Sequence, residues 1–194
     1  LHILSGIIPW TFFSASISTG LECIVNNHQL LNKVPLPPHT IVFSEVLTQL
    51  LNFLLSLPVI IVVMALTRVL PTAAIIQVIP LLVCLFLMSY SISLILGITY
   101  VYFRDLKHLM TIILQFWFYL TPIMYRVEMI PNEYRDFLYF NPIGSLFSGL
   151  HLAIAEGKFL DSTGWTACLI WTAGLLALAS CLVKKFKHRI VELL

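Results

Sequence analysis

A run of four aromatic side chains is the stretch of this sequence whose chemistry most suggests a binding surface. Phe116, Trp117, Phe118 and Tyr119 lie within residues 109–125, which contain no Asp, Glu, Lys or Arg. Their rings offer flat apolar faces, and the Trp N–H and Tyr hydroxyl add hydrogen-bonding groups. Successive helical residues point about 100° apart, so one surface takes only one or two of the four rings. We consider Phe116, Trp117 and Tyr119 candidate binding residues; an aromatic belt at a membrane interface is the alternative.

Charged side chains gather directly before the aromatic run. Arg104, Asp105 and Lys107 precede it, and the next charged residue is Arg126. Adjacent helical residues do not face one another, so Arg104 and Asp105 need not pair. We expect each of them to cap a helix or to bridge to a neighbouring element at a membrane boundary.

Residues that could catalyse a reaction or bind a metal are not arranged for either purpose. The sequence has no H-E-x-x-H, G-x-S-x-G or G-x-x-x-x-G-K-[ST] motif. Its four cysteines lack C-x-x-C spacing, and its six histidines lack metal-ligand spacing. We therefore expect no metal or cofactor in this chain and no ATP hydrolysis by it, so it is not expected to be an enzyme.

The composition is that of an integral membrane protein. Hydrophobic residues make up 59% of the 194 residues and charged residues 10%, against about 25% charged in soluble domains. The mean hydropathy is +0.96. The apolar runs are long and do not alternate with polar residues, which favours helices over the strands of a membrane barrel. The predicted fold class is all-α.

Five apolar runs approach or exceed the roughly twenty residues that a helix needs to cross a bilayer. They cover about residues 3–25, 41–66, 73–100, 109–125 and 165–183. The third is longer than needed, so we expect it to tilt or to project from the membrane. The chain is predicted to be a single transmembrane domain over residues 1–194.

Lysine and arginine in the connections set the predicted orientation, because cytoplasmic loops are enriched in them. One side carries seven of these residues and the other side four. The first set is Lys33, Arg104, Lys107, Lys184, Lys185, Lys187 and Arg189, and the second is Arg68, Arg126, Arg135 and Lys158. The C-terminus is therefore predicted to be cytoplasmic, and the net charge of +2 is a topology signal rather than a sign of nucleic-acid binding. Residue 1 then lies outside without signal-peptide features, so we expect at least one further span before it.

Two connections are unusual for simple loops. Residues 26–40, on the predicted cytoplasmic side, contain Leu30, Leu31 and Val34 on a short helical pattern that prolines end. Residues 127–160, on the other side, contain two apolar pieces that flank Asn141 and Pro142. These pieces are too short to span and too apolar for a free loop, so we predict a helical hairpin that dips into the outer leaflet.

Six motifs in fixed order carry a family resemblance across essentially the whole chain. They are SGIIPWTFFSASISTG (5–20), LLNKVPLP (30–37), YFRDL (102–106), TPIMY (121–125), IP (130–131) and NPI (141–143). This order resembles the permease subunit of ABC exporters that move polysaccharides such as O-antigen, capsule or teichoic acid.

The resemblance implies an architecture and partners. It implies six spans after an amphipathic helix, and a homodimer in the bacterial inner membrane with a continuous polysaccharide channel. Two separate ATPase subunits would bind ATP and Mg²⁺. The ATPase-coupling residues would be Leu30, Leu31, Lys33, Val34 and Pro37, and the re-entrant hairpin at the outer mouth would include Pro131, Asn141 and Pro142. The aromatic candidates would stack on sugar rings in the channel.

Some positions depart from the family pattern, and two other functions stay open. Pro38 and His39 stand where a charged pair is usual, and Ser148 and His151 stand where an acidic residue and an arginine are common. One alternative is an ABC exporter permease for a drug or a lipid. The other is a secondary transporter or channel without an ATPase, which is less favoured because Glu22 and Glu45 are the only acidic or basic side chains within the predicted spans.

Overall fold

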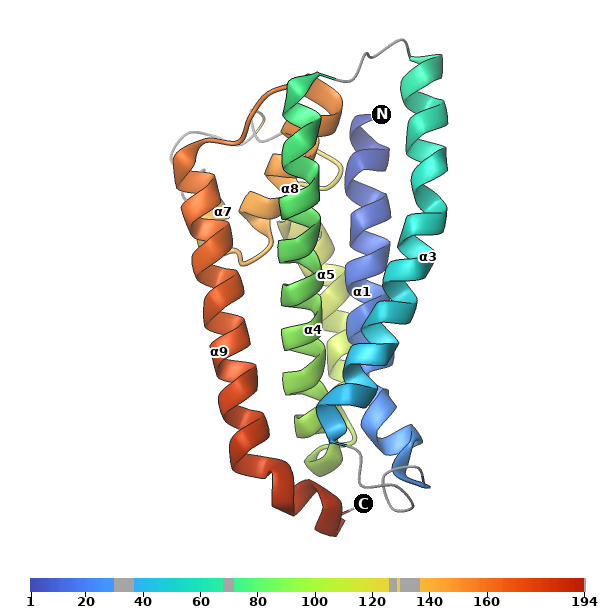
Figure 1. Ribbon diagram of the computed structural model, residues 1–194, viewed down its shortest axis with the longest axis vertical. Coiled ribbons are helices and arrows are strands. Elements are labelled where there is room, and N and C mark those ends of the chain that lie inside the picture. The colour runs from blue at the N-terminus through green and yellow to red at the C-terminus, as the bar shows by residue number, and fades with distance from the viewer. Residues whose placement is uncertain (30–36, 68–71, 126–128, 130–136, 194) are drawn as a thin grey trace.

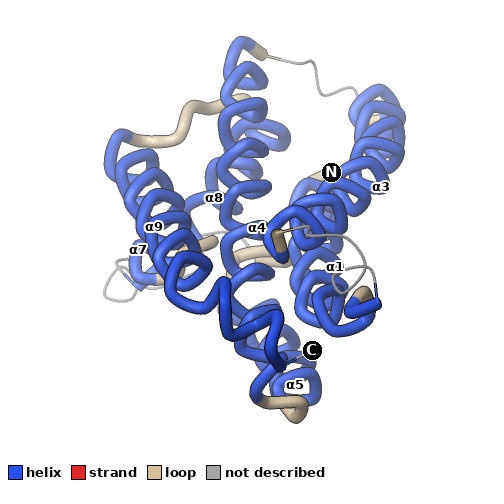
Figure 2. Tube along the Cα trace, turned by 60° about the horizontal axis from the view of Figure 1, so that its bottom comes forward, coloured by secondary structure: helices blue, strands red, loops and turns tan. Residues whose placement is uncertain are grey.

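The structure, a computed structural model, describes residues 1–29, 37–67, 72–125, 129 and 137–193, with side chains omitted at 137, 138 and from 186 onward. The described residues form helices joined by loops and turns and contain no strand (Figure 2). The elements are α1 (His2–Asn26), α3 (Pro38–Leu66), η1 (Ala73–Gln77), α4 (Val78–Tyr102), α5 (Leu106–Leu120), α7 (Phe137–Phe140), α8 (Gly144–His151), η3 (Leu152–Glu156) and α9 (Ser162–Leu193). The all-α prediction is confirmed for this part of the chain.

Five long helices run roughly side by side, alternately up and down the long axis of the molecule (Figure 1). Helices α1, α4 and α9 descend in this view, and α3 and α5 rise. Helix α4 is central, because it contacts α1, α3, α5, α8 and α9. The short elements α7, α8 and η3 lie in the upper half, so the described helices of the lower half are the long ones.

Small residues bring α1 and α4 into close contact. A Cβ atom on Gly20 would lie 2.6 Å from Ser93 Cβ, and one on Gly97 would lie 3.1 Å from the Gly20 carbonyl oxygen. The Ser93 hydroxyl also donates to the Ser16 carbonyl at 2.9 Å. Small residues and serine hydroxyls are the groups that hold helices together where lipid, not water, surrounds them. This contact anchors α1 in the bundle.

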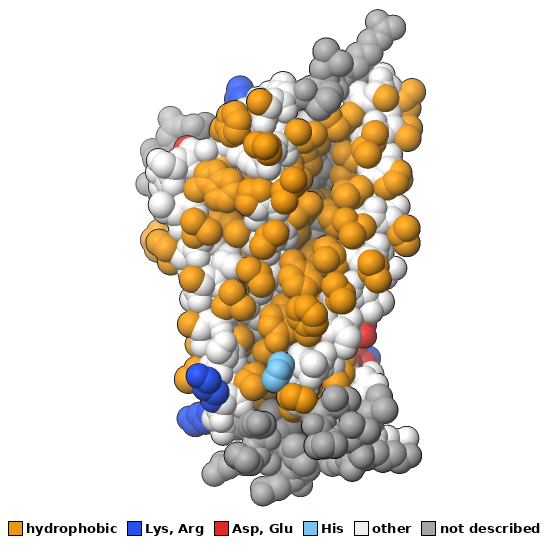
Figure 3. All heavy atoms as spheres, in the orientation of Figure 1, with side chains coloured by type: hydrophobic (Ala, Val, Ile, Leu, Met, Phe, Trp, Pro, Cys, Tyr) orange, Lys and Arg blue, Asp and Glu red, His pale blue; other side chains and the backbone are white. Residues whose placement is uncertain are grey.

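Among the residues that the structure describes, three helices are long and apolar enough to cross a membrane: Pro38–Leu66, Ala73–Tyr102 and Ser162–Lys185. Apolar side chains cover the face over α9, α4 and α3, while Lys, Arg and His appear near its edges (Figure 3). Contact between such an apolar surface and lipid hydrocarbon is favourable, whereas contact between it and water is unfavourable. The structure therefore agrees with the prediction that this is a multi-pass membrane protein.

The bounds of α3, α5 and α9 differ from the predicted spans, and a proline explains the difference in the first two. Helix α3 begins at Pro38, three residues before the predicted 41, because proline suits the first helical position. Helix α5 ends at Leu120 rather than at 125. Thr121 has φ −95° and ψ 138° because Pro122 disfavours a helical conformation in the residue before it. Helix α9 extends well past the predicted end at 183.

Two short helices, α7 and α8, flank a turn at Asn141–Ile143. The loop that follows η3 is held by one buried amide: Gln77 donates to the Lys158 carbonyl at 2.7 Å and accepts from the Leu160 N–H at 2.9 Å. Gly157 has φ 66°, a conformation that glycine adopts without strain. The segment from α7 to α9 is thus fixed to the end of the bundle where α4 begins.

Candidate functional site

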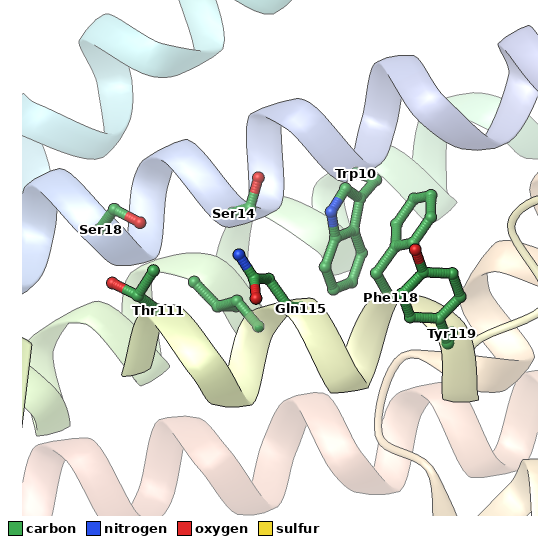
Figure 4. Close-up of a pocket in the computed structure, with 8 residues that line it drawn as sticks. Trp10, Ser14, Ser18, Thr111, Gln115, Phe118 and Tyr119 are labelled. Atoms are coloured by element: carbon green, nitrogen blue, oxygen red, sulfur yellow. The ribbon is translucent and has the colours of Figure 1, made fainter. Parts of the chain in front are cut away.

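A groove between α1 and α5 combines polar and aromatic side chains (Figure 4). Its volume is about 330 Å³. The lining residues are Trp10, Ser14 and Ser18 from α1 and Thr111, Leu114, Gln115, Phe118 and Tyr119 from α5. Hydroxyl and amide groups occupy one end of the groove, and aromatic rings occupy the other.

The polar groups form two stripes because their spacing matches the helix repeat. Trp10, Ser14 and Ser18 are four residues apart, as are Thr111, Gln115 and Tyr119, and residues four apart lie on one helix face. The two helices run in opposite directions. The aromatic end of each stripe therefore meets the aromatic end of the other, and Trp10 lies 5.5 Å from Phe118 in an edge-to-face contact.

Two of the polar groups in the groove are free to bind a ligand. Ser14 donates to the Thr11 carbonyl at 3.3 Å, and Thr111 donates to the Lys107 carbonyl at 3.0 Å. Ser18 and Gln115 make no hydrogen bond to any residue that the structure describes, and both are exposed. The Gln115 amide can donate and accept at once. The groove thus offers hydrogen bonds beside aromatic faces, which is binding chemistry.

The three predicted aromatic candidates are separated by the fold. Tyr119 lines the groove and is 72% exposed, whereas Phe116 is 67% exposed and lies outside the lining. Trp117 turns toward the bundle and packs edge-to-face on Phe13 at 5.5 Å. Its N–H, which we expected to serve a ligand hydroxyl, donates instead to Asn141 Oδ1 at 2.9 Å.

Asn141 links the end of α5 to the turn between α7 and α8. Its Oδ1 accepts from Trp117 and from the Ile143 N–H at 3.2 Å, and its Nδ2 donates to Thr121 Oγ1 at 3.0 Å. The predicted aromatic site and the predicted hairpin are therefore in direct contact, and the bend at Pro122 is held from both sides. Pro142, beside it, is half-buried.

His151 holds the same bend from the α1 side. This buried ring donates from Nε2 to the Pro122 carbonyl at 2.8 Å, and its Nδ1 lies 2.8 Å from Ser5 Oγ. It also stacks on His2 at 4.1 Å between ring centroids. A Cβ on Gly6 would lie 2.6 Å from the Ile123 carbonyl oxygen, so only glycine permits this approach. Helix α1 and the end of α5 are thereby locked together above the groove.

At the lower boundary, the observed ion pair involves Lys107 rather than Arg104 or Asp105. Lys107 Nζ lies 2.7 Å from Glu22 Oε1, which joins α5 to α1. The Arg104 guanidinium lies over the Tyr100 ring at 5.4 Å. Asp105 occupies the N-cap position of α5 without a side-chain cap bond, and neither residue forms an ion pair within the described ranges. We had expected each of the two residues to cap a helix or to bridge to a neighbouring element, and we had not expected the Lys107–Glu22 pair.

Several predicted site residues lie outside the described residues. These are Leu30, Leu31, Lys33 and Val34 of the predicted coupling loop and Pro131 of the predicted hairpin. Pro37 is described and occupies the N-cap position of α3.

Sequence reasoning missed the groove residues Trp10, Ser14, Ser18, Thr111 and Gln115. Their four-residue spacing within apolar helices was the available signal.

A helical bundle whose described part includes helices long and apolar enough to cross a membrane defines the broad class of multi-pass membrane proteins. The family model for the ABC-2 type transporter matches residues 2–154. The chain belongs to this family.

Similar proteins agree with that assignment. An O-antigen export system permease protein RfbA from Klebsiella pneumoniae is 26% identical over 199 residues, covering 100% of this chain and 75% of the relative. One from Myxococcus xanthus is 30% identical over 190 residues, covering 96% and 73%. The resemblance drawn from the six sequence motifs is confirmed.

Proposed function

We propose that this chain is the channel-forming permease of an ABC exporter that moves a polysaccharide, in lipid-linked form, across the bacterial inner membrane. The observation that carries the proposal is the groove between α1 and α5, where hydroxyl and amide groups stand beside aromatic faces. The printed names of the relatives, which are O-antigen export permeases, support a polysaccharide as the cargo.

The lining suits a polymer that must slide without being trapped. A sugar ring presents axial C–H bonds that stack on an exposed aromatic face, here Tyr119, and hydroxyls that reach Gln115 and the serines. Each hydrogen bond has a net value of only about 1 kcal/mol, so a moving chain can exchange one partner for the next. No strongly attractive charge lies in the lining.

The proposed topology has five crossings in this chain, α1 and α5 being the two besides the three long apolar helices. The lower end in Figure 1 is then cytoplasmic, with the C-terminus there and residue 1 outside. The lysine and arginine distribution supports this orientation. Helix α1 has 25 residues, or about 37 Å, which is enough to cross about 30 Å of hydrocarbon.

We propose that the predicted hairpin within residues 127–160, of which the structure describes residues 129 and 137–160, enters the membrane from the outer side. Helix α5 has 15 residues, or about 22 Å, so the non-helical residues 121–125 that follow it complete the crossing of about 30 Å of hydrocarbon. Non-helical backbone at membrane depth requires partners within the protein. The Pro122 carbonyl has such a partner in His151, and the Asn141 turn has Trp117 and Thr121.

A second copy of the chain closes the open side of the groove in the proposed exporter. Ser18, Gln115 and Tyr119 are exposed on that side, and polar groups that face lipid are costly. The predicted coupling residues Leu30, Leu31, Lys33, Val34 and Pro37 would contact a separate ATPase subunit. That subunit would bind ATP and Mg²⁺ and hydrolyse the nucleotide.

Deletion of the gene tests the proposal. We expect the deletion strain to lose polysaccharide from the cell surface and to accumulate it inside, and the full-length gene to restore export. Unchanged surface polysaccharide together with a lowered resistance to toxic compounds would instead assign the chain to drug export and overturn the proposal.

A further inference from the structure

A second cleft lies at the lower end of the bundle, where the first residues of α3 and the last described side chains of α9 flank α4. Its volume is about 370 Å³. It is lined by Pro37 and His39 from the start of α3, Tyr90 and Leu94 from α4, and Leu176, Ala179, Ser180, Val183 and Lys184 from α9. It shares no lining residue with the groove between α1 and α5.

The cleft is apolar inside and polar at its exposed edge. Leu94 and Ala179 are buried at 2% and 1% exposure and form its floor. Ser180 and Lys184 are exposed. The α9 residues lie on one face because they recur at three- and four-residue spacing. An occupant therefore needs an apolar part that enters between the helices and a polar part that stays at the edge.

Unused polar groups point to the chemistry of that polar part. His39 Nδ1 is buried without a hydrogen-bond partner, and a buried ring nitrogen without a partner is unfavourable. The Tyr90 hydroxyl has no hydrogen bond to a described residue, and Lys184 has no ion pair within the described ranges. A cation beside neutral hydrogen-bonding groups matches a phosphate ester that also carries hydroxyls.

The position of the cleft indicates that such a ligand comes from the membrane. Lys, Arg and His side chains lie at the lower edge of the apolar surface (Figure 3), where a membrane helix bundle meets lipid headgroups. Lys184 and Lys185 are followed in the sequence by Lys187 and Arg189. Basic clusters directly beyond a membrane helix attract anionic lipids.

We propose that this cleft binds one anionic glycerophospholipid of the cytoplasmic leaflet. One acyl chain lies against Leu94, Leu176 and Val183, and the phosphate pairs with Lys184. A headgroup hydroxyl donates to His39 Nδ1. The lipid thereby links the start of α3 to the end of α9. This inference does not depend on which cargo the protein moves.

Native mass spectrometry of the full-length protein, purified in detergent, tests the proposal. The probes are dioleoylphosphatidylglycerol, which is anionic, and dioleoylphosphatidylcholine, which is zwitterionic. We expect the wild-type protein to prefer the anionic lipid. Lys184→Gln should lower the affinity for the anionic lipid about fivefold, the factor that corresponds to ~1 kcal/mol per basic residue at a membrane surface. The same variant should leave phosphatidylcholine binding unchanged.

Two further variants separate a defined site from general charge attraction. Lys185→Gln removes the same charge one residue away, outside the lining. It should lower the affinity for the anionic lipid less than Lys184→Gln does. Ser180→Trp fills the cleft and should remove one bound lipid while the protein stays monodisperse. Equal losses in both lysine variants, a wild-type lipid count in Ser180→Trp, or no preference for the anionic lipid would each overturn the proposal. A wild-type lipid count in Ser180→Trp would indicate that another segment of the chain fills the cleft. A lack of preference for the anionic lipid would indicate that the cleft binds an uncharged lipid.

Discussion

The groove between α1 and α5 and the upper half of α3 are both exposed, but their side chains are opposite in character. Leu55, Ile61 and Leu66 of α3 are 79%, 65% and 77% exposed, and all are apolar. In the groove, the exposed residues include Ser18, Thr111 and Gln115. Against hydrocarbon an exposed leucine is ordinary, and an exposed amide is not. In this protein, exposed polar side chains rather than buried ones therefore mark the surface that meets something other than lipid.

Filling the groove should give the largest effect. Ser14→Trp adds a bulky ring between the two polar stripes, and we expect export to fall at least about tenfold, a change that ~1.4 kcal/mol on a barrier produces. Leu55→Trp is the matched control, since it adds the same ring on the exposed apolar surface of α3. Export by both variants is measured per membrane-resident complex. Comparable losses in the two would remove the distinction between the two surfaces.

Removing one aromatic face should give the next largest effect. Tyr119→Ala deletes a ring in the groove, and we expect about fivefold lower export, as the loss of ~1 kcal/mol of stacking implies. Tyr119→Phe keeps the face and should stay near wild type. Phe116→Ala deletes an aromatic ring three residues away, outside the lining, and serves as the control. A larger loss in Phe116→Ala than in Tyr119→Ala would move the binding face to the other side of α5.

Trp117 should affect stability more than export. Trp117→Phe keeps the contact with Phe13 but loses the hydrogen bond to Asn141. We expect a cost of about 1 kcal/mol in stability, visible as a lower Tm of the purified full-length protein. Export per assembled complex should stay normal. Low export per assembled complex together with an unchanged Tm would instead indicate that Trp117 lines the channel, as the sequence alone suggested.

The Lys107–Glu22 pair should have the smallest effect, because both side chains are partly exposed to solvent. The hydrogen bond and charge of Glu22 raise the pKa of Lys107 above its ordinary value of 10.5. The stabilisation is therefore fully present below pH 10.5 and is lost as the pH rises through the raised pKa. We expect Lys107→Gln to lower the Tm slightly at neutral pH and not at all at strongly alkaline pH. An equal drop at both would assign the effect to packing.

Much of the fold could be predicted because apolar length alone specifies a membrane helix. The pieces around Asn141 and Pro142 were also predictable, since they are too short to span. The rotation of α5 was not, because it depends on which neighbours the helix meets. Only the contacts of Trp117 with Phe13 and Asn141 reveal that it faces inward while Tyr119 faces the groove.

The groove escaped prediction for a related reason. Serine and threonine within apolar helices often bond to their own backbone, as Ser14 does with the Thr11 carbonyl, so they are easily assigned to packing. The stripe on α1 becomes meaningful only beside the stripe on α5, which is about a hundred residues away in the sequence. Likewise, Glu22 showed no partner until the fold brought Lys107 to it.

Photo-crosslinking in cells tests the central claim, that the groove is one wall of the polysaccharide path, most directly. A benzophenone amino acid would replace Tyr119 in one variant and Leu55 in another, two positions that are 72% and 79% exposed. After illumination during export, immunoblots of the permease report attached polymer as a ladder of higher mass. We predict a ladder from position 119 and none from position 55. A ladder from position 55 alone, or none from position 119 in an actively exporting strain, would contradict the account.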